Sequence, residues 1–117
     1  NQFVKQLFNG ALLDSAQLNK MITPTYLFRD LNAEGLEWFD HAVGLSWFLN
    51  LDKNERPIYV SHGGNTEGYN CDVHYNVQTG LSIIIGMNLF PTKDYEPVFS
   101  TQHQLINSIH EYYKAKE

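Results

Sequence analysis

Hydrophobic and polar residues alternate with a period of two through the middle of the chain. Residues 43–51 and 69–77 each follow this pattern, which is typical of a strand that buries one face. Residues 58–62 form a shorter strand-like run, and the nearly continuous apolar run 81–87 indicates a strand covered on both faces. Short turn-like segments separate these runs. The pattern predicts three or four consecutive antiparallel strands.

Helical spacing marks the two ends of the chain. Residues 1–9 are predicted to form the tail of a helix that stops at Asn9-Gly10, and Asp14 or Ser15 can cap a second short helix to about residue 21. Residues 23–41 show no clear period and are treated as a long connection. Pro97 opens a final helix whose apolar stripe is predicted to lie on the sheet. That stripe consists of Val98, Leu105, Ile106, Ile109 and Tyr113.

The elements together predict an α+β fold. An antiparallel β-sheet is expected to be packed by a C-terminal helix and by short N-terminal helices. With 117 residues, of which 43% are hydrophobic, the chain is expected to form a single domain over residues 1–117.

Charge and composition narrow the partners. The formal net charge of −5 gives no general attraction for nucleic acid or anionic lipid. The apolar runs are far shorter than the roughly 20 residues of a membrane-spanning helix. We therefore expect no nucleic-acid partner and no membrane span, and no metal or organic cofactor is implied.

Neither Ser46 nor Cys71 has the sequence surroundings of a nucleophile. Ser46 stands in Gly44-Leu45-Ser46-Trp47-Phe48, which begins like a nucleophile elbow but lacks the closing glycine and falls inside a strand pattern. Cys71, the one cysteine, excludes an internal disulfide. It shares an alternating face with Val73 and Tyr75, so we interpret it as a small buried hydrophobe.

The histidines offer a weak metal hypothesis. His62, Asp72 and His74 are residue types that bind zinc. Asp72 and His74 share one strand face, but nothing in the sequence directs His62 toward them, and a solvated polar face is the favoured interpretation. The other histidines are interpreted as surface or boundary residues. They are His41, His103 and His110.

The segment His62-Gly63-Gly64-Asn65 is the main candidate for function. Two adjacent glycines at the end of a strand-like run can form a bulge or tight corner with no chemical role. Alternatively, the exposed backbone N–H groups can stabilise negative charge on a substrate carbonyl oxygen. On the residues alone, both interpretations stay open.

The order of segments resembles the C-terminal part of the class C β-lactamase-like serine hydrolases, which include penicillin-binding proteins, D,D-peptidases and esterases. The segments that carry the resemblance run over nearly the whole chain. They are residues 3–14, Met21, Val43-Gly44-Leu45-Ser46-Trp47-Phe48, His62-Gly63-Gly64-Asn65-Thr66-Glu67-Gly68-Tyr69 and residues 79–88. In that family the third active-site motif is Lys-Thr-Gly or a His-x-Gly variant, and His62-Gly63-Gly64 matches the second form.

The resemblance implies roles for individual residues. His62 would contact a substrate carboxylate or assist proton transfer, and Gly63 and Gly64 would line the cleft. The backbone N–H of Asn65 would supply one oxyanion donor, in acyl transfer on a β-lactam, a D-alanyl peptide or an ester. An extracytoplasmic or cell-envelope location is also an implication of the resemblance.

The chain departs from the family pattern in one respect. Neither Ser-x-x-Lys nor Tyr-x-Asn or Ser-x-Asn occurs in residues 1–117, and the chain begins at Asn1 without an initiator methionine. We therefore expect roughly the last third of a longer enzyme, inactive alone, whose exposed sheet edge pairs with the missing N-terminal part or self-associates. The alternative is a non-catalytic binding or regulatory module of the same fold. An upstream reading frame with or without the missing motifs distinguishes the two.

Overall fold

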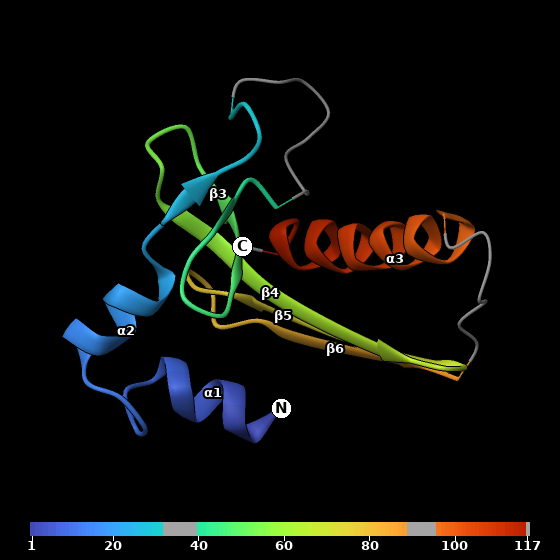
Figure 1. Ribbon diagram of the computed structural model, residues 1–117, viewed down its shortest axis with the longest axis horizontal. Coiled ribbons are helices and arrows are strands. Elements are labelled where there is room, and N and C mark those ends of the chain that lie inside the picture. The colour runs from blue at the N-terminus through green and yellow to red at the C-terminus, as the bar shows by residue number, and fades with distance from the viewer. Residues whose placement is uncertain (32–39, 89–95, 117) are drawn as a thin grey trace.

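One antiparallel sheet organises the chain. The computed structural model describes residues 1–31, 40–88 and 96–116. In these residues six strands lie side by side in the same order as in the chain. They are β1 (Tyr26–Leu27), β2 (Ala42–Val43), β3 (Phe48–Leu51), β4 (Pro57–Thr66), β5 (Tyr69–Asn76) and β6 (Ser82–Met87). The helices are α1 (Gln2–Phe8), α2 (Ser15–Ile22) and α3 (Glu96–Lys114). The predicted α+β class with an antiparallel sheet is confirmed (Figure 1).

The two N-terminal helices begin and end close to the predicted residues. Asp14 caps α2, because its Oδ1 accepts a hydrogen bond of 2.8 Å from the backbone N–H of Gln17. The Gln17 side chain in turn accepts from the backbone N–H of Asp14, which completes a capping box. The sequence signal for this helix start is therefore confirmed.

The single strand expected over residues 43–51 is wrong. The chain instead folds into the β2–β3 hairpin, with Ser46 in the left-handed region at a φ of 67°. The backbone N–H of Gly44 donates to the Trp47 carbonyl over 2.9 Å. A Cβ at Gly44 would lie 2.6 Å from the Met21 carbonyl oxygen, so α2 packs too closely here for any larger residue.

The strand expected over residues 58–62 continues to Thr66, so Gly63-Gly64 forms neither the bulge nor the tight corner that was one of its two interpretations. β4 runs without a register shift from Tyr59 to Thr66 against β5, and both glycines lie inside the paired stretch. The chain turns only at Glu67-Gly68, where Gly68 adopts a φ of 78°. Glycine at position 68 supplies the positive φ that a tight hairpin turn requires.

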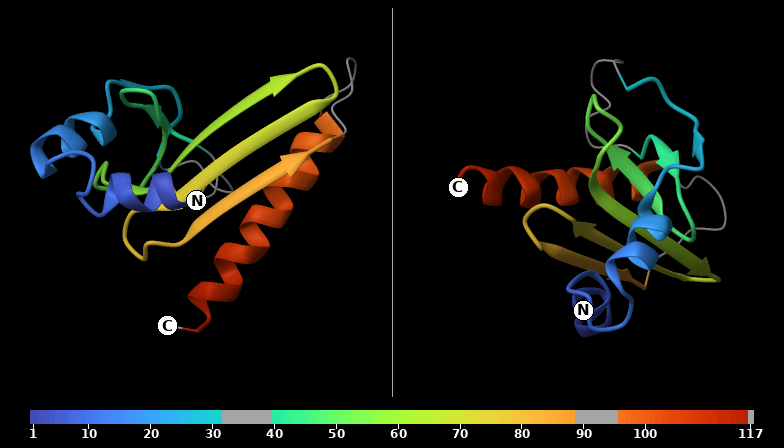
Figure 2. Two further views of the ribbon diagram at one scale, coloured as in Figure 1. Left: turned by 90° about the horizontal axis from the view of Figure 1, so that it is seen from below. Right: turned by 90° about the vertical axis from the view of Figure 1, so that its left-hand side faces the viewer.

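One face of the sheet carries the apolar core. Val4 and Leu7 of α1 pack with Trp47, Val60 and Tyr75 in a cluster of buried side chains. The Phe8 ring stacks on Tyr75 with 4.3 Å between ring centroids and meets Trp47 edge-on. This alternate set of strand residues therefore faces α1. The right-hand view of Figure 2 shows α1 and α3 on opposite sides of the sheet.

Helix α3 crosses the opposite face. Its inward-facing residues are Gln102, Ile106 and His110, each at most 5% exposed, whereas Leu105 and Tyr113 of the predicted apolar stripe are about half exposed. The predicted stripe is therefore wrong in part. The reason is the sheet beneath, which presents polar side chains to α3.

The last strand departs from the expectation of cover on both faces. β6 pairs with β5 alone among the described strands, and it is one of the two edge strands of the described sheet, β1 being the other. Ile83 is buried while Ile84 is 44% exposed.

In the part of the chain that the structure describes, no helix is long and apolar enough to cross a membrane.

Candidate functional site

Strand β4 has two halves that differ in their neighbours. Its first half pairs with β3 up to Ser61, which lies opposite Phe48, while the whole strand from Tyr59 onward pairs with β5. Beyond Ser61 the described strands leave the β3 side of β4 open, and residues 62–66 are all exposed. Because alternate residues of a strand direct their N–H and C=O groups to opposite edges, part of this backbone faces the open side.

The four predicted site residues lie in this open half, but not on one face. His62 and Gly64 have the same alternation as the core residue Val60, so they lie on the α1 side of the sheet. Gly63 and Asn65 lie on the α3 side. The His62 ring is 6.1 Å from the Phe48 ring, centroid to centroid.

The two glycines have different surroundings. A Cβ at Gly63 would lie 3.1 Å from Oδ1 of Asp72, the residue opposite it on β5. A Cβ at Gly64 would meet nothing within 4 Å. Gly64 therefore leaves bare backbone open to an approaching molecule, whereas Gly63 accommodates a carboxylate of the protein itself.

A shallow groove of about 570 Å³ runs across the end of the sheet near this segment. Gly64, Asn65 and Thr66 line it from β4, and Tyr69, Cys71 and Gly86 face them from the neighbouring strands. His62 and Gly63 are outside the lining. Cys71 is exposed, so its interpretation as a buried hydrophobe is wrong, because no described helix covers this end of the α1 face.

A polar cluster lies between the sheet and α3. The Ser61 hydroxyl donates to the Asp40 carboxylate over 3.0 Å. The Gln102 side-chain amide donates to Asp72 Oδ2 over 2.8 Å and joins α3 to β5. His74 Nε2 lies 3.5 Å from the same Asp72 oxygen. The Gln102–Asp72 hydrogen bond therefore joins α3 to the sheet where a purely apolar stripe was expected.

Burial shifts the pKa of two acidic groups around this cluster. It raises the pKa of Asp40, and the Ser61 hydrogen bond opposes that shift in part. Burial also raises the pKa of Tyr59, with a smaller contribution from the Asp40 charge. The Tyr59 hydroxyl therefore stays protonated at neutral pH, and Ser61, being buried on this network, is poorly placed to act as a nucleophile.

The histidines are distributed differently from the sequence expectations. His74 is 5% exposed, so Asp72 and His74 belong to a covered face and not to a solvated one. His62 lies on the opposite face of the sheet, and the described residues contain no group of three or more potential metal ligands. His41 and His110 are also buried, which corrects their interpretation as surface or boundary residues. His41 Nδ1 accepts a hydrogen bond from the Leu51 backbone N–H.

Sequence reasoning missed the polar cluster, although a signal was present. Asp72 and His74 stand two residues apart on a strand, and Gln102, Ile106 and His110 recur every four residues on a helix. Such spacings put each set on one face. Reading the two polar patterns together would have predicted that those faces pack on each other.

The comparisons with known proteins give no relative. No family model, no curated protein and no solved structure matches the chain significantly.

Proposed function

We propose that this chain is the C-terminal portion of a β-lactamase-like serine hydrolase, and that the open half of β4 forms one wall of its acyl-transfer cleft. The observation that carries the proposal is the β3-side edge of residues 62–66, with which none of the described strands pairs. This edge is exposed and contains two glycines, so a substrate can approach the backbone N–H groups directly.

The chemistry divides between this chain and the rest of the parent protein. A serine outside residues 1–117 attacks the carbonyl carbon of an amide or ester, and the leaving group departs to give an acyl-enzyme that water hydrolyses. The backbone N–H of Asn65 donates to the carbonyl oxygen as negative charge develops there. The chain alone has no nucleophile in this scheme and is inactive.

His62 is the side chain that we assign to the cleft. It is exposed on the same face as Gly64, and no described helix covers that face beyond α1. A helical lobe of the parent bearing the nucleophile would occupy this space. His62 then contacts the substrate carboxylate or assists proton transfer, on a β-lactam, a D-alanyl peptide or an ester.

Covalent labelling tests the proposal. The full-length parent is incubated with a fluorophosphonate and with a fluorescent penicillin, and the labelled residue is located by peptide mass spectrometry. We expect a labelled serine outside residues 1–117, and no label on the isolated chain. His62→Ala should slow labelling by about 10²-fold, the usual contribution of a positioned proton-transfer group. Lys53→Gln, in the exposed turn before β4, is the control and should change nothing.

Failure takes two forms. A parent that neither probe labels would overturn the acyl-transfer function. A label that forms on a serine of the isolated chain would overturn the division of the site between two parts of the parent.

The edge of β6 supports a related proposal about partners. Within the described sheet β6 has one neighbour, and the N–H and C=O groups of its outer side are open to pairing. Strands from the missing N-terminal part would cover this edge in the parent, and the chain alone should self-associate. Light scattering after size-exclusion chromatography should show dimers at high concentration. A strict monomer would contradict this proposal and leave the labelling result unaffected.

A further inference from the structure

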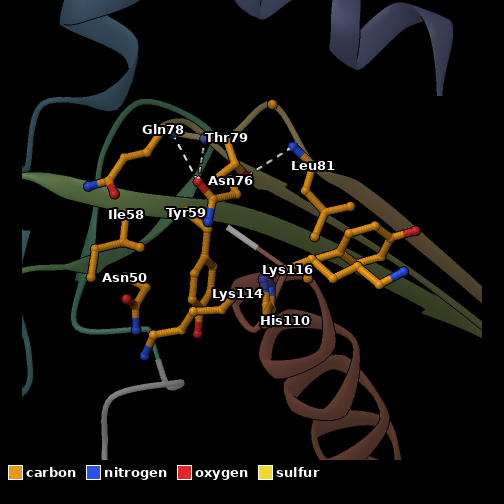
Figure 3. A pocket seen from close by; sticks show the side chains of 12 residues that line it. Asn50, Ile58, Tyr59, Asn76, Gln78, Thr79, Leu81, His110, Lys114 and Lys116 are labelled. Atoms are coloured by element: carbon orange, nitrogen blue, oxygen red, sulfur yellow. Dashed lines mark hydrogen bonds between the residues drawn. The ribbon is translucent and has the colours of Figure 1, made fainter.

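A second cavity lies at the other end of the sheet from residues 62–66. It occupies about 650 Å³ between the start of β4, the turn after β5 and the C-terminal end of α3. Small-molecule sites have volumes of roughly 300–1,000 Å³. Figure 3 shows the side chains that line this cavity, which we call the α3-end pocket.

The inner wall of the α3-end pocket is aromatic and apolar. The Tyr59 ring stacks on the His110 ring with 5.1 Å between centroids and 20° between planes. Ile58, Leu81 and Tyr113 add apolar surface around this pair. A flat or short aliphatic group can therefore bury most of its surface here.

The aromatic wall carries no charge at neutral pH. Burial raises the pKa of Tyr59 and keeps its hydroxyl protonated. Burial also lowers the pKa of His110, and the neighbouring His74 acts in the same direction. The imidazole is therefore neutral near pH 7, and any charge in the pocket comes from other side chains.

The charged side chains of the pocket are two lysines, one in the last turn of α3 and one just beyond it. Lys114 and Lys116 line the pocket, and none of the acidic side chains that the structure describes does. The Lys116 amine contacts the Tyr112 hydroxyl, which leaves Lys114 as the cation better placed for a ligand. The pocket is therefore locally positive although the whole chain has a formal net charge of −5. The negative end of a helix is equivalent to about half an elementary charge, which is less than the two lysines supply.

The polar rim is held in place. Asn76 Oδ1 accepts hydrogen bonds from the backbone N–H groups of Gln78 and Thr79, at 2.9 and 3.0 Å. These bonds fix the turn that forms one side of the opening, as the dashed lines in Figure 3 show. A wall that is already ordered costs little conformational entropy on binding.

We propose that the α3-end pocket binds a small amphipathic carboxylate, an aromatic or short aliphatic acid. Its apolar part lies against Ile58, Leu81 and Tyr113, over the buried Tyr59–His110 pair. Its carboxylate pairs with Lys114 at the opening. The proposal rests on this cavity alone and is independent of the proposed acyl-transfer function.

Titration of the ¹⁵N-labelled chain followed by NMR tests the pocket. The probes are 4-phenylbutyrate and its uncharged amide, 4-phenylbutyramide. We expect saturable shifts of the Ile58, Leu81 and His110 amide signals with the acid, and a Kd about threefold to fivefold weaker for the amide, which is the usual worth of an exposed ion pair. Lys114→Gln should weaken acid binding by a similar factor and leave amide binding unchanged.

A matched lysine provides the control. Lys53→Gln removes the same charge from an exposed turn outside the pocket and should leave both affinities unchanged. Absence of saturable shifts up to about 10 mM, a concentration far above weak specific binding, would overturn the site. Equal affinity for acid and amide, or no effect of Lys114→Gln, would overturn the assignment of a carboxylate ligand.

Discussion

The two halves of β4 belong to one strand and share one partner in β5, yet they differ in every other respect. Ile58–Ser61 has β3 on its second edge, α1 packed over one face and α3 over the other. His62–Thr66 lacks a described neighbour on that edge and is exposed throughout. The difference teaches that strand pairing holds the open half in place while its surface stays available. A binding wall needs that combination of rigidity and access.

The largest expected contrast comes from removing one ring in each half. Tyr59 is 1% exposed and contacts the His74 and His110 rings. Tyr59→Ala should lower the free energy of unfolding by about 3–5 kcal/mol, as loss of a buried aromatic side chain does. His62→Ala should change it by less than about 0.5 kcal/mol. Urea unfolding followed by fluorescence measures both, and equal losses would remove the distinction between the halves.

A smaller contrast lies between the two adjacent glycines. Gly63→Ala should destabilise the fold by about 1 kcal/mol, because the new methyl group presses on the Asp72 carboxylate that binds Gln102. Gly64→Ala should stabilise it by about 0.5 kcal/mol, since the site is open and alanine restricts the unfolded chain. Thermal melts of the two variants check this. If Gly64→Ala were the less stable variant, the assignment of Gly63 to the face covered by α3 would be contradicted.

The pH dependence of stability sharpens the description of the closed half. Burial and, to a smaller extent, His74 hold the pKa of His110 below its ordinary value of 6.5, and Glu111 opposes them. Stability from neutral His110 is therefore complete above pH 6.5 and is lost as the pH falls from there through the lowered pKa. His110→Phe keeps a ring against Tyr59 and should flatten the slope of stability against pH in that window. If the slope were unchanged in His110→Phe, the pH dependence of stability would come from other titratable groups.

The predictable part of the fold is the part that local pattern decides. The Asp14 capping box and the alternation in residues 69–77 each depend on a few neighbouring residues, and the structure places α2 and β5 accordingly. The hairpin at Ser46 could not be found in this way. Residues on both sides of the turn continue the apolar alternation, and the deciding constraint is the close contact of Gly44 with Met21 of α2.

The candidate site, like the fold, was predictable only where neighbouring residues decide the structure. The segment of residues 62–65 stood out in sequence because glycines expose backbone. Its continuous pairing with β5, and the end of β3 opposite Ser61, are long-range facts that no local window contains. Likewise, the polar contact between the sheet and α3 depends on the pairing of Asp72 with Gln102, which are far apart in the sequence.

Amide hydrogen exchange of the dilute chain tests the central claim most directly, because it reports each backbone N–H of β4 separately. The account predicts strong protection at residues 58–61, and an alternating pattern at residues 62–66 in which the amides bonded to β5 are protected. The amides on the open edge should exchange about 10²-fold faster or more, as groups without a stable hydrogen bond do. Uniform protection from residue 58 to residue 66 would contradict it, because the edge that we assign to a substrate would already be occupied.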